Sequence, residues 1–264
     1  MADGPHGYLR RDKGSPQCLV EAGEVDARRE RVFERRLLGR EDCLRSREVS
    51  IATGHVGYPA ESPYSPSIAY PEYCFGSETL AEETNDAYEG VREALHLLQL
   101  DEEHYGRKDW NPLGQVIRPG DTVVLKPNFV REFRETRPGL DDCTITHGAI
   151  IRAAVDYAYI ALKGTGRIII ADAPQGEANF DEICRIAGLD RIQDLYRRYA
   201  DVEVEVYDLR PERSRTLDGA LIGYEPLPGD PRGYATVDLG IHSMFVPIEH
   251  LCRRVYGSDH HRRE

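Results

Sequence analysis

Two short runs of apolar, β-branched residues dominate the hydrophobic pattern of the middle of the chain. Thr122–Leu125 and Arg167–Ala171 both end at polar residues, and a proline follows shortly after. Between them, apolar residues recur every three or four positions over His147–Leu162, which predicts a helix with one broad buried face and Thr146 as its N-cap. A strand, a helix and a strand in this order predict a βαβ unit of a parallel sheet.

Weaker periodic segments lie on both sides of this unit. Leu80–Leu100 carries Tyr88, Val91 and Leu95 at helical spacing. The expected fold class is α/β, with a mainly parallel sheet built of βαβ units, flanking helices, irregular N- and C-terminal segments and an incomplete domain. The further predicted elements are helices Leu80–Leu100, Glu177–Ala187 and Asp190–Tyr199, and strands Glu48–Thr53, Val202–Tyr207, Ala220–Tyr224 and Ala235–Leu239.

Composition divides the chain into three parts. Residues 1–47 are rich in charge and poor in large apolar side chains, which predicts a flexible arm. Residues 48–210 form the expected α/β core, including a long ordered loop over 54–76 whose tyrosines either line a pocket or anchor the loop. Residues 211–264 are a loop-rich extension, and its short strands leave a sheet edge uncovered, so we expect self-association.

Charge and composition narrow the classes of partner. The 264 residues carry a formal net charge of −12, which argues against nucleic acid or an anionic membrane surface as the main partner. No apolar run approaches the roughly 20 residues of a membrane-spanning helix, and the N-terminus lacks an apolar signal region. We therefore expect a cytoplasmic protein without a membrane partner. The six cysteines include no C-x-x-C pair, so no zinc or iron–sulfur ligand set is predicted, and the cofactor is unknown.

Polar residues follow both predicted strands of the βαβ unit. Lys126 and Asn128 come after the first strand, and Asp172 and Gln175 after the second. The carboxyl ends of parallel strands meet at one edge of a sheet, where ligands bind in such folds. A lysine there binds an anion or acts as a base, against the alternative of an ordinary surface lysine. Asp172 orients a ligand hydroxyl, holds a metal or acts as a base, or else it caps the following turn.

The start of the predicted helix adds a second group of candidates. Thr144 and Thr146 offer hydroxyls beside the free amides of a helix N-terminus, which suits a phosphate or a carboxylate. His147 could serve there as a base, an electrophile or a metal ligand, or simply pack in the first turn. The predicted catalytic residues are Lys126, His147 and Asp172, the predicted substrate-binding residues are Asn128, Thr144, Thr146 and Gln175, and no metal ligands are predicted.

Several segments resemble a widespread prokaryotic family known as domain of unknown function 362. They are SIAYPEYCFG (67–76), WNPLG (110–114), VVLKPNFVREF (123–133), THGAIIRAAVDYA (146–158) and RIIIADAPQ (167–175). The resemblance covers residues 48–210, and it implies no reaction, because the family has no settled activity. The order of elements is also similar to that in the N-terminal half of lactate racemase-like enzymes, which is a likeness of fold only.

The family resemblance also bears on the extent of the chain. Similar members continue into a second half with a PKLKTH-like strand end, so the resemblance implies an N-terminal portion of a longer protein or a shortened member. Our leading hypothesis is an enzyme that binds a small anionic substrate through the strand-end lysine, histidine and aspartate. The alternatives are a metal- or iron–sulfur-associated redox accessory protein and a non-catalytic fragment.

Overall fold

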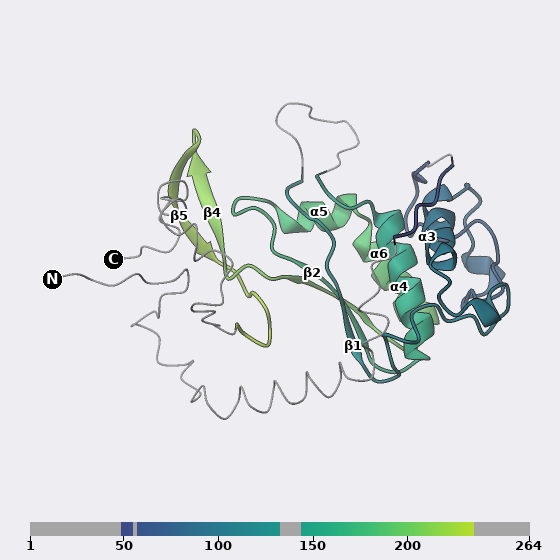
Figure 1. Ribbon diagram of the computed structural model, residues 1–264. Helices are drawn as coiled ribbons and strands as arrows, with labels where there is room; N and C mark the ends of the chain where they lie inside the picture. The colour runs from purple at the N-terminus through teal and green to yellow at the C-terminus, as the bar shows by residue number, and fades with distance from the viewer. Residues whose placement is uncertain (1–48, 55–56, 133–143, 235–264) are drawn as a thin grey trace, which may run out of the picture. The chain divides into compact units, whose positions relative to one another are not determined.

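A parallel sheet lies at the centre of the structure, a computed structural model that describes residues 49–54, 57–132 and 144–234 (Figure 1). Its three strands in the described residues are hydrogen-bonded in chain order. They are β1 (Thr122–Leu125), β2 (Arg167–Asp172) and β3 (Val204–Asp208). The prediction of an α/β fold with a parallel sheet and βαβ units is confirmed.

Helices connect and cover the strands of this sheet (Figure 1). The helix α4 joins β1 to β2, α5 and α6 join β2 to β3, and α3 packs against α4. The helices are α3 (Asp86–Leu97), α4 (Gly148–Leu162), α5 (Phe180–Ile186) and α6 (Leu189–Tyr199), with short 3-10 turns at Ser77–Thr79 and Glu102–His104. Beyond the sheet, β4 (Glu212–Leu217) and β5 (Ala220–Pro226) form an antiparallel hairpin.

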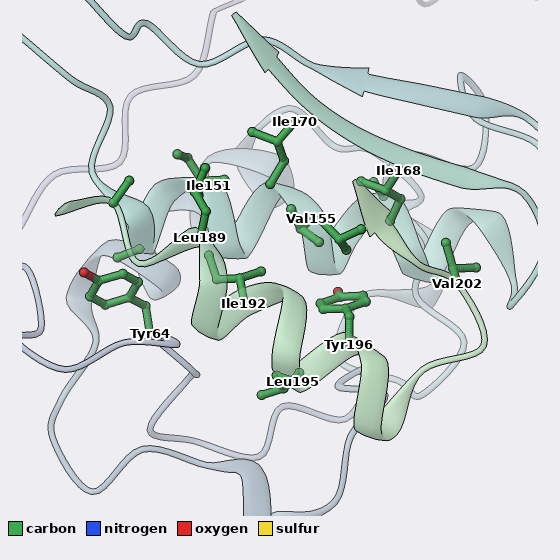
Figure 2. Close-up of a cluster of buried hydrophobic side chains, with 14 of the residues drawn as sticks. Tyr64, Ile151, Val155, Ile168, Ile170, Leu189, Ile192, Leu195, Tyr196 and Val202 are labelled. Carbon is green, nitrogen blue, oxygen red and sulfur yellow. The ribbon is translucent and has the colours of Figure 1, made fainter. Parts of the chain in front are cut away.

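The main hydrophobic core lies between the sheet and the helices α4 and α6. Ile168 and Ile170 of β2 point into this layer, where Val155 of α4 and Ile192 and Tyr196 of α6 meet them (Figure 2). All five side chains are fully buried. The period-2 alternation of the strand and the period of about 3.6 residues of the helices therefore place their apolar residues on one common surface.

The helix boundaries differ from the prediction where side chains reach back to cap them. Helix α3 begins at Asp86 rather than at Leu80, because the side-chain oxygen of Asn85 accepts a hydrogen bond from the amide of Tyr88. The side-chain amide nitrogen of Asn85 also donates to the carbonyls of Tyr64 and Ser65, so the residue that caps the helix is bound to the tyrosine-rich loop. Helix α5 likewise begins later than predicted, after the N-cap Asn179.

The predicted strand over Glu48–Thr53 is wrong in its described part. Residues 49–53 form no strand, and the side chains of Val49 and Ile51 are largely exposed. A short segment of alternating apolar residues forms a strand only when a neighbouring strand supplies backbone hydrogen bonds, and residues 49–53 have no such neighbour among the described residues. The predicted arm over 1–47 and the predicted strand Ala235–Leu239 lie outside the described residues, whereas the predicted strand Ala220–Tyr224 is part of β5.

A buried ion pair on α4 connects the helices to one another. The Nε of Arg152 lies 2.8 Å from Oδ1 of Asp156, and both side chains are almost completely buried. The hydroxyls of Tyr88 from α3 and Tyr196 from α6 both donate hydrogen bonds to Asp156. Burial and the charge of Asp156 raise the pKa of both tyrosines well above the ordinary value, so both hydroxyls keep their protons.

The same arginine anchors the proline- and tyrosine-rich loop. The guanidinium of Arg152 donates to the carbonyl of Pro63 at 3.1 Å, to the hydroxyl of Ser65 at 3.0 Å and to that of Tyr73 at 3.2 Å. Burial alone would lower the pKa of Arg152, but the charge of Asp156 raises it, so the guanidinium stays charged. The loop is thus ordered as predicted, and Tyr73 serves to anchor it.

Loss of the carboxylate partner should destabilise the fold strongly. We expect Asp156→Asn to lower the free energy of unfolding by about 3–5 kcal/mol, because Arg152 would stay buried without a charged partner. Urea denaturation measures this change. Asp194→Asn, which removes a surface partner of Arg197, serves as the control and should have little effect. A loss below about 1 kcal/mol for Asp156→Asn would contradict the importance assigned to the pair.

Candidate functional site

Three chain segments are joined by hydrogen bonds of their backbone amides beyond the carboxyl ends of β1 and β2. The amide of Asn128 donates to Oγ1 of Thr146 at 2.9 Å, and the amide of Thr146 donates to the carbonyl of Asn128 at 3.0 Å. Val130 donates to the carbonyl of Thr144 at 3.0 Å, and Gln175 donates to the carbonyl of Val130 at 2.9 Å. The chain leaving β1 is therefore tied both to the start of α4 and to the loop after β2.

The carboxylate of Asp172 connects both strand ends of this edge. Its side chain is only 7% exposed, and Oδ1 lies 2.9 Å from Nζ of Lys126. The amide of Ala173 donates to Oδ1 at 2.9 Å, and the amide of Phe129 donates to Oδ2 at 2.7 Å. With donors on both oxygens, Asp172 is a fixed anchor for Lys126, whose own side chain is 68% exposed.

His147, rather than Thr146, is the N-cap of α4, so the predicted capping residue is wrong. Nδ1 of His147 accepts a hydrogen bond from the amide of Ala149 at 3.1 Å, while the hydroxyl of Thr146 already accepts one from Asn128. A ring nitrogen that accepts carries no proton, so in this geometry the ring proton belongs on Nε2. The imidazole stacks on the ring of Tyr58, with centroids 4.2 Å apart, and lies 5.1 Å from that of Tyr64.

A second ion pair lies at the end of β3 and was not predicted. Asp208 is the register partner of Asp172, and its carboxylate lies 2.6 Å from Nη2 of Arg210. Arg210 is almost fully buried, and its Nη1 donates to the carbonyls of Gln175 at 2.7 Å and Gly176 at 3.1 Å. The rule that singled out Lys126 and Asp172, polar residues just after a strand, would also have found this pair.

The structure thus brings the predicted site residues to one edge but uses several of them structurally. Lys126 and Asp172 are in direct contact, and Asn128 and Gln175 are exposed beside them. The hydroxyl of Thr144 donates to the carbonyl of Arg131, and that of Thr146 binds Asn128, so both threonines hold the backbone. The ring of His147 contacts the tyrosine-rich loop. The catalytic and binding roles assigned to these residues stay predictions.

No group of three or more histidine, cysteine, aspartate and glutamate residues among 49–54, 57–132 and 144–234 is arranged to hold a metal ion. No helix in these ranges is long and apolar enough to cross a membrane.

The chain matches no protein-family model, no curated protein and no solved structure. Its function is therefore inferred from the residues of the site alone.

The two partners of the strand-end ion pair should differ in their importance for stability. We expect Asp172→Asn to lower the free energy of unfolding by about 1–3 kcal/mol, because a buried acceptor of several donors is replaced. Lys126→Met should cost clearly less, since Lys126 is mostly exposed and Asp172 keeps its two backbone donors. Chemical denaturation of both variants tests this order. An equal loss for the two substitutions would show that Asp172 is not the anchor.

Proposed function

We propose that this α/β domain binds a small anionic molecule, such as a carboxylate or a phosphate, at the carboxyl edge of its parallel sheet. The ammonium group of Lys126 is the group that contacts the anion. One observation carries the proposal: Lys126 is mostly exposed to solvent, yet its nitrogen is held 2.9 Å from the buried carboxylate of Asp172. A lysine that is both fixed and accessible is suited to bind a ligand without losing much side-chain entropy.

The surroundings of Asp172 favour binding of a second anion by the same lysine. The carboxylate also accepts hydrogen bonds from the backbone amides of Phe129 and Ala173, and the dipoles of these amides offset part of its negative charge. Its charge is therefore shared among three donors rather than directed at Lys126 alone. The ammonium also donates to the carbonyl of Pro127 at 3.3 Å, and its third N–H can be donated to an anion from solvent.

In this proposal His147 supplies a proton donor and acceptor next to the bound anion, and Asp172 positions Lys126. With Nδ1 held by the amide of Ala149, Nε2 is the ring nitrogen that would exchange a proton with the substrate. The stacked ring of Tyr58 restricts the rotation of the imidazole. The resemblance to the domain of unknown function 362 family is part of this proposal, and it specifies no reaction.

Binding of simple anions tests the proposal directly. We expect lactate, malonate or inorganic phosphate to shift amide resonances of residues 126–130 and 172–175 in a saturable manner. Lys126→Met should weaken this binding about tenfold or more, because a charged hydrogen bond is lost. Lys108→Met is the matched control, since Lys108 is an exposed lysine of the connector after α3. The proposal fails if Lys126→Met binds these anions as tightly as the unaltered protein.

Two substitutions of His147 separate capping from chemistry. Asparagine is a good N-cap, so His147→Asn should keep the stability within a few tenths of a kcal/mol, whereas His147→Ala should lose about 1 kcal/mol. If the imidazole contacts the anion, both variants should weaken anion binding to a similar extent. Thermal unfolding and the same anion titration provide the two measurements. Unchanged binding in His147→Asn would remove His147 from the proposed site.

A further inference from the structure

We infer that a second anion-binding site, specific for a phosphate-type oxyanion, lies in the groove between the β4–β5 hairpin and the loop after β2. The groove has a volume of about 540 Å³ and is polar. It contains neither Lys126 nor Asp172, so the inference goes beyond the function proposed above. Its lining residues are Arg131, Glu177, Arg213, Ser214, Arg215, Thr216, Gly219 and Glu225.

The hairpin is fixed to the loop that forms the other wall of the groove. The amide of Ser214 donates to the carbonyl of Gly176 at 2.8 Å, and the hydroxyl of Thr216 donates to Oε2 of Glu177 at 2.9 Å. The approach is so close that a Cβ at position 176 would collide with the hydroxyl of Ser214. Arg210 also binds this loop, because its guanidinium donates hydrogen bonds to the carbonyls of Gln175 and Gly176. The groove is therefore a formed feature rather than a gap beside a loose hairpin.

The charges of the groove favour an anion. Arg131 lies 3.3 Å from Glu177, and Arg213 lies 2.8 Å from Glu225, so two arginines are held in place by glutamates. Arg215 is the third arginine, and its register partner on β5 is Gly223, which has no side chain. The side chain of Arg215 forms no hydrogen bond or ion pair within the described residues, although its charge adds to that of the closer Arg213 in lowering the pKa of Glu225. Three arginines and two glutamates leave an excess of positive charge in a chain whose net charge is −12.

The donors that line the groove include the side-chain types that bind phosphate well. A guanidinium offers two parallel N–H groups to two oxygens of one tetrahedral anion, which a lysine cannot do. Ser214 also lines the groove, although the alternation of β4 places its side chain on the opposite strand face from that of Arg215. The arginines that pair with Glu177 and Glu225 are already ordered, so an incoming oxyanion would have to immobilise only Arg215. The groove would also hold a small organic group attached to the phosphate.

Titration of the whole chain with inorganic phosphate, followed by amide resonances, tests this site and distinguishes it from the edge at Lys126. We expect saturable shifts over residues 213–219 and 176–177. Arg215→Met should weaken this binding about tenfold, since a charge-assisted bidentate contact is lost. Arg215→Lys should have an intermediate effect because it keeps the charge but not the paired N–H groups. Arg118→Met, in an exposed turn away from the groove, should leave binding unchanged.

The outcomes separate the two anion sites. Shifts at 213–219 that persist in Lys126→Met and disappear in Arg215→Met support the groove even if the edge at Lys126 binds nothing. Absence of saturable shifts at the groove overturns the inference. Equal weakening by Arg118→Met and Arg215→Met also overturns it, because the effect would then reflect general charge rather than a site. A melting temperature that is unchanged in Arg215→Met, expected for an exposed residue, confirms that the variant is folded.

Discussion

The buried pair of Arg152 and Asp156 is the interaction on which the remaining structure depends. Two opposite charges inside a hydrophobic core are stable only when nearly every donor and acceptor is satisfied. The partners that satisfy them come from α3, from α6 and from the proline- and tyrosine-rich loop, all distant in sequence from α4. The requirement to satisfy one ion pair therefore fixes three separate parts of the chain around one helix.

This constraint extends to the candidate site through the tyrosine-rich loop. Arg152 binds the backbone of Pro63 and the side chain of Ser65, on either side of Tyr64. The ring of Tyr64 lies against His147 at the first turn of the same helix. Helix α4 thus binds the loop through the buried Arg152 of its second turn and has His147 at its N-terminus. The positions of the loop and of the histidine are therefore fixed by the same helix.

At the carboxyl edge of the sheet, opposite charges are arranged on neighbouring strands. Asp172 and Asp208 are register partners, and each has its own cation, Lys126 and Arg210. The two cations differ in exposure: Arg210 is buried and holds the loop after β2, whereas Lys126 reaches solvent. Such a division gives one ion pair a structural role and leaves the other accessible to a ligand. It is the physical basis for assigning anion binding to Lys126.

Local sequence determined the elements that carry this edge. The run RIIIAD forms a buried strand because β-branched residues suit the interior of a parallel sheet, whereas TVVL is a β-branched strand that alternates exposed and half-buried residues. The polar residues after both strands fall at the carboxyl edge by the geometry of βαβ units. The contact of Lys126 with Asp172 follows from that rule, although the two residues lie far apart in the chain. The class of fold and the location of the candidate site could therefore be predicted.

Tertiary structure decided the features that depend on partners distant in sequence. Thr146 looks like an N-cap, but its hydroxyl is bound by the amide of Asn128, so His147 caps α4 instead. The burial of Arg152 cannot be inferred from the apolar periodicity of α4, because it depends on where the proline- and tyrosine-rich loop packs against the helix. Propensity describes what a residue can do with its neighbours in the chain, whereas the donor or acceptor it finally binds is fixed only when distant segments pack together.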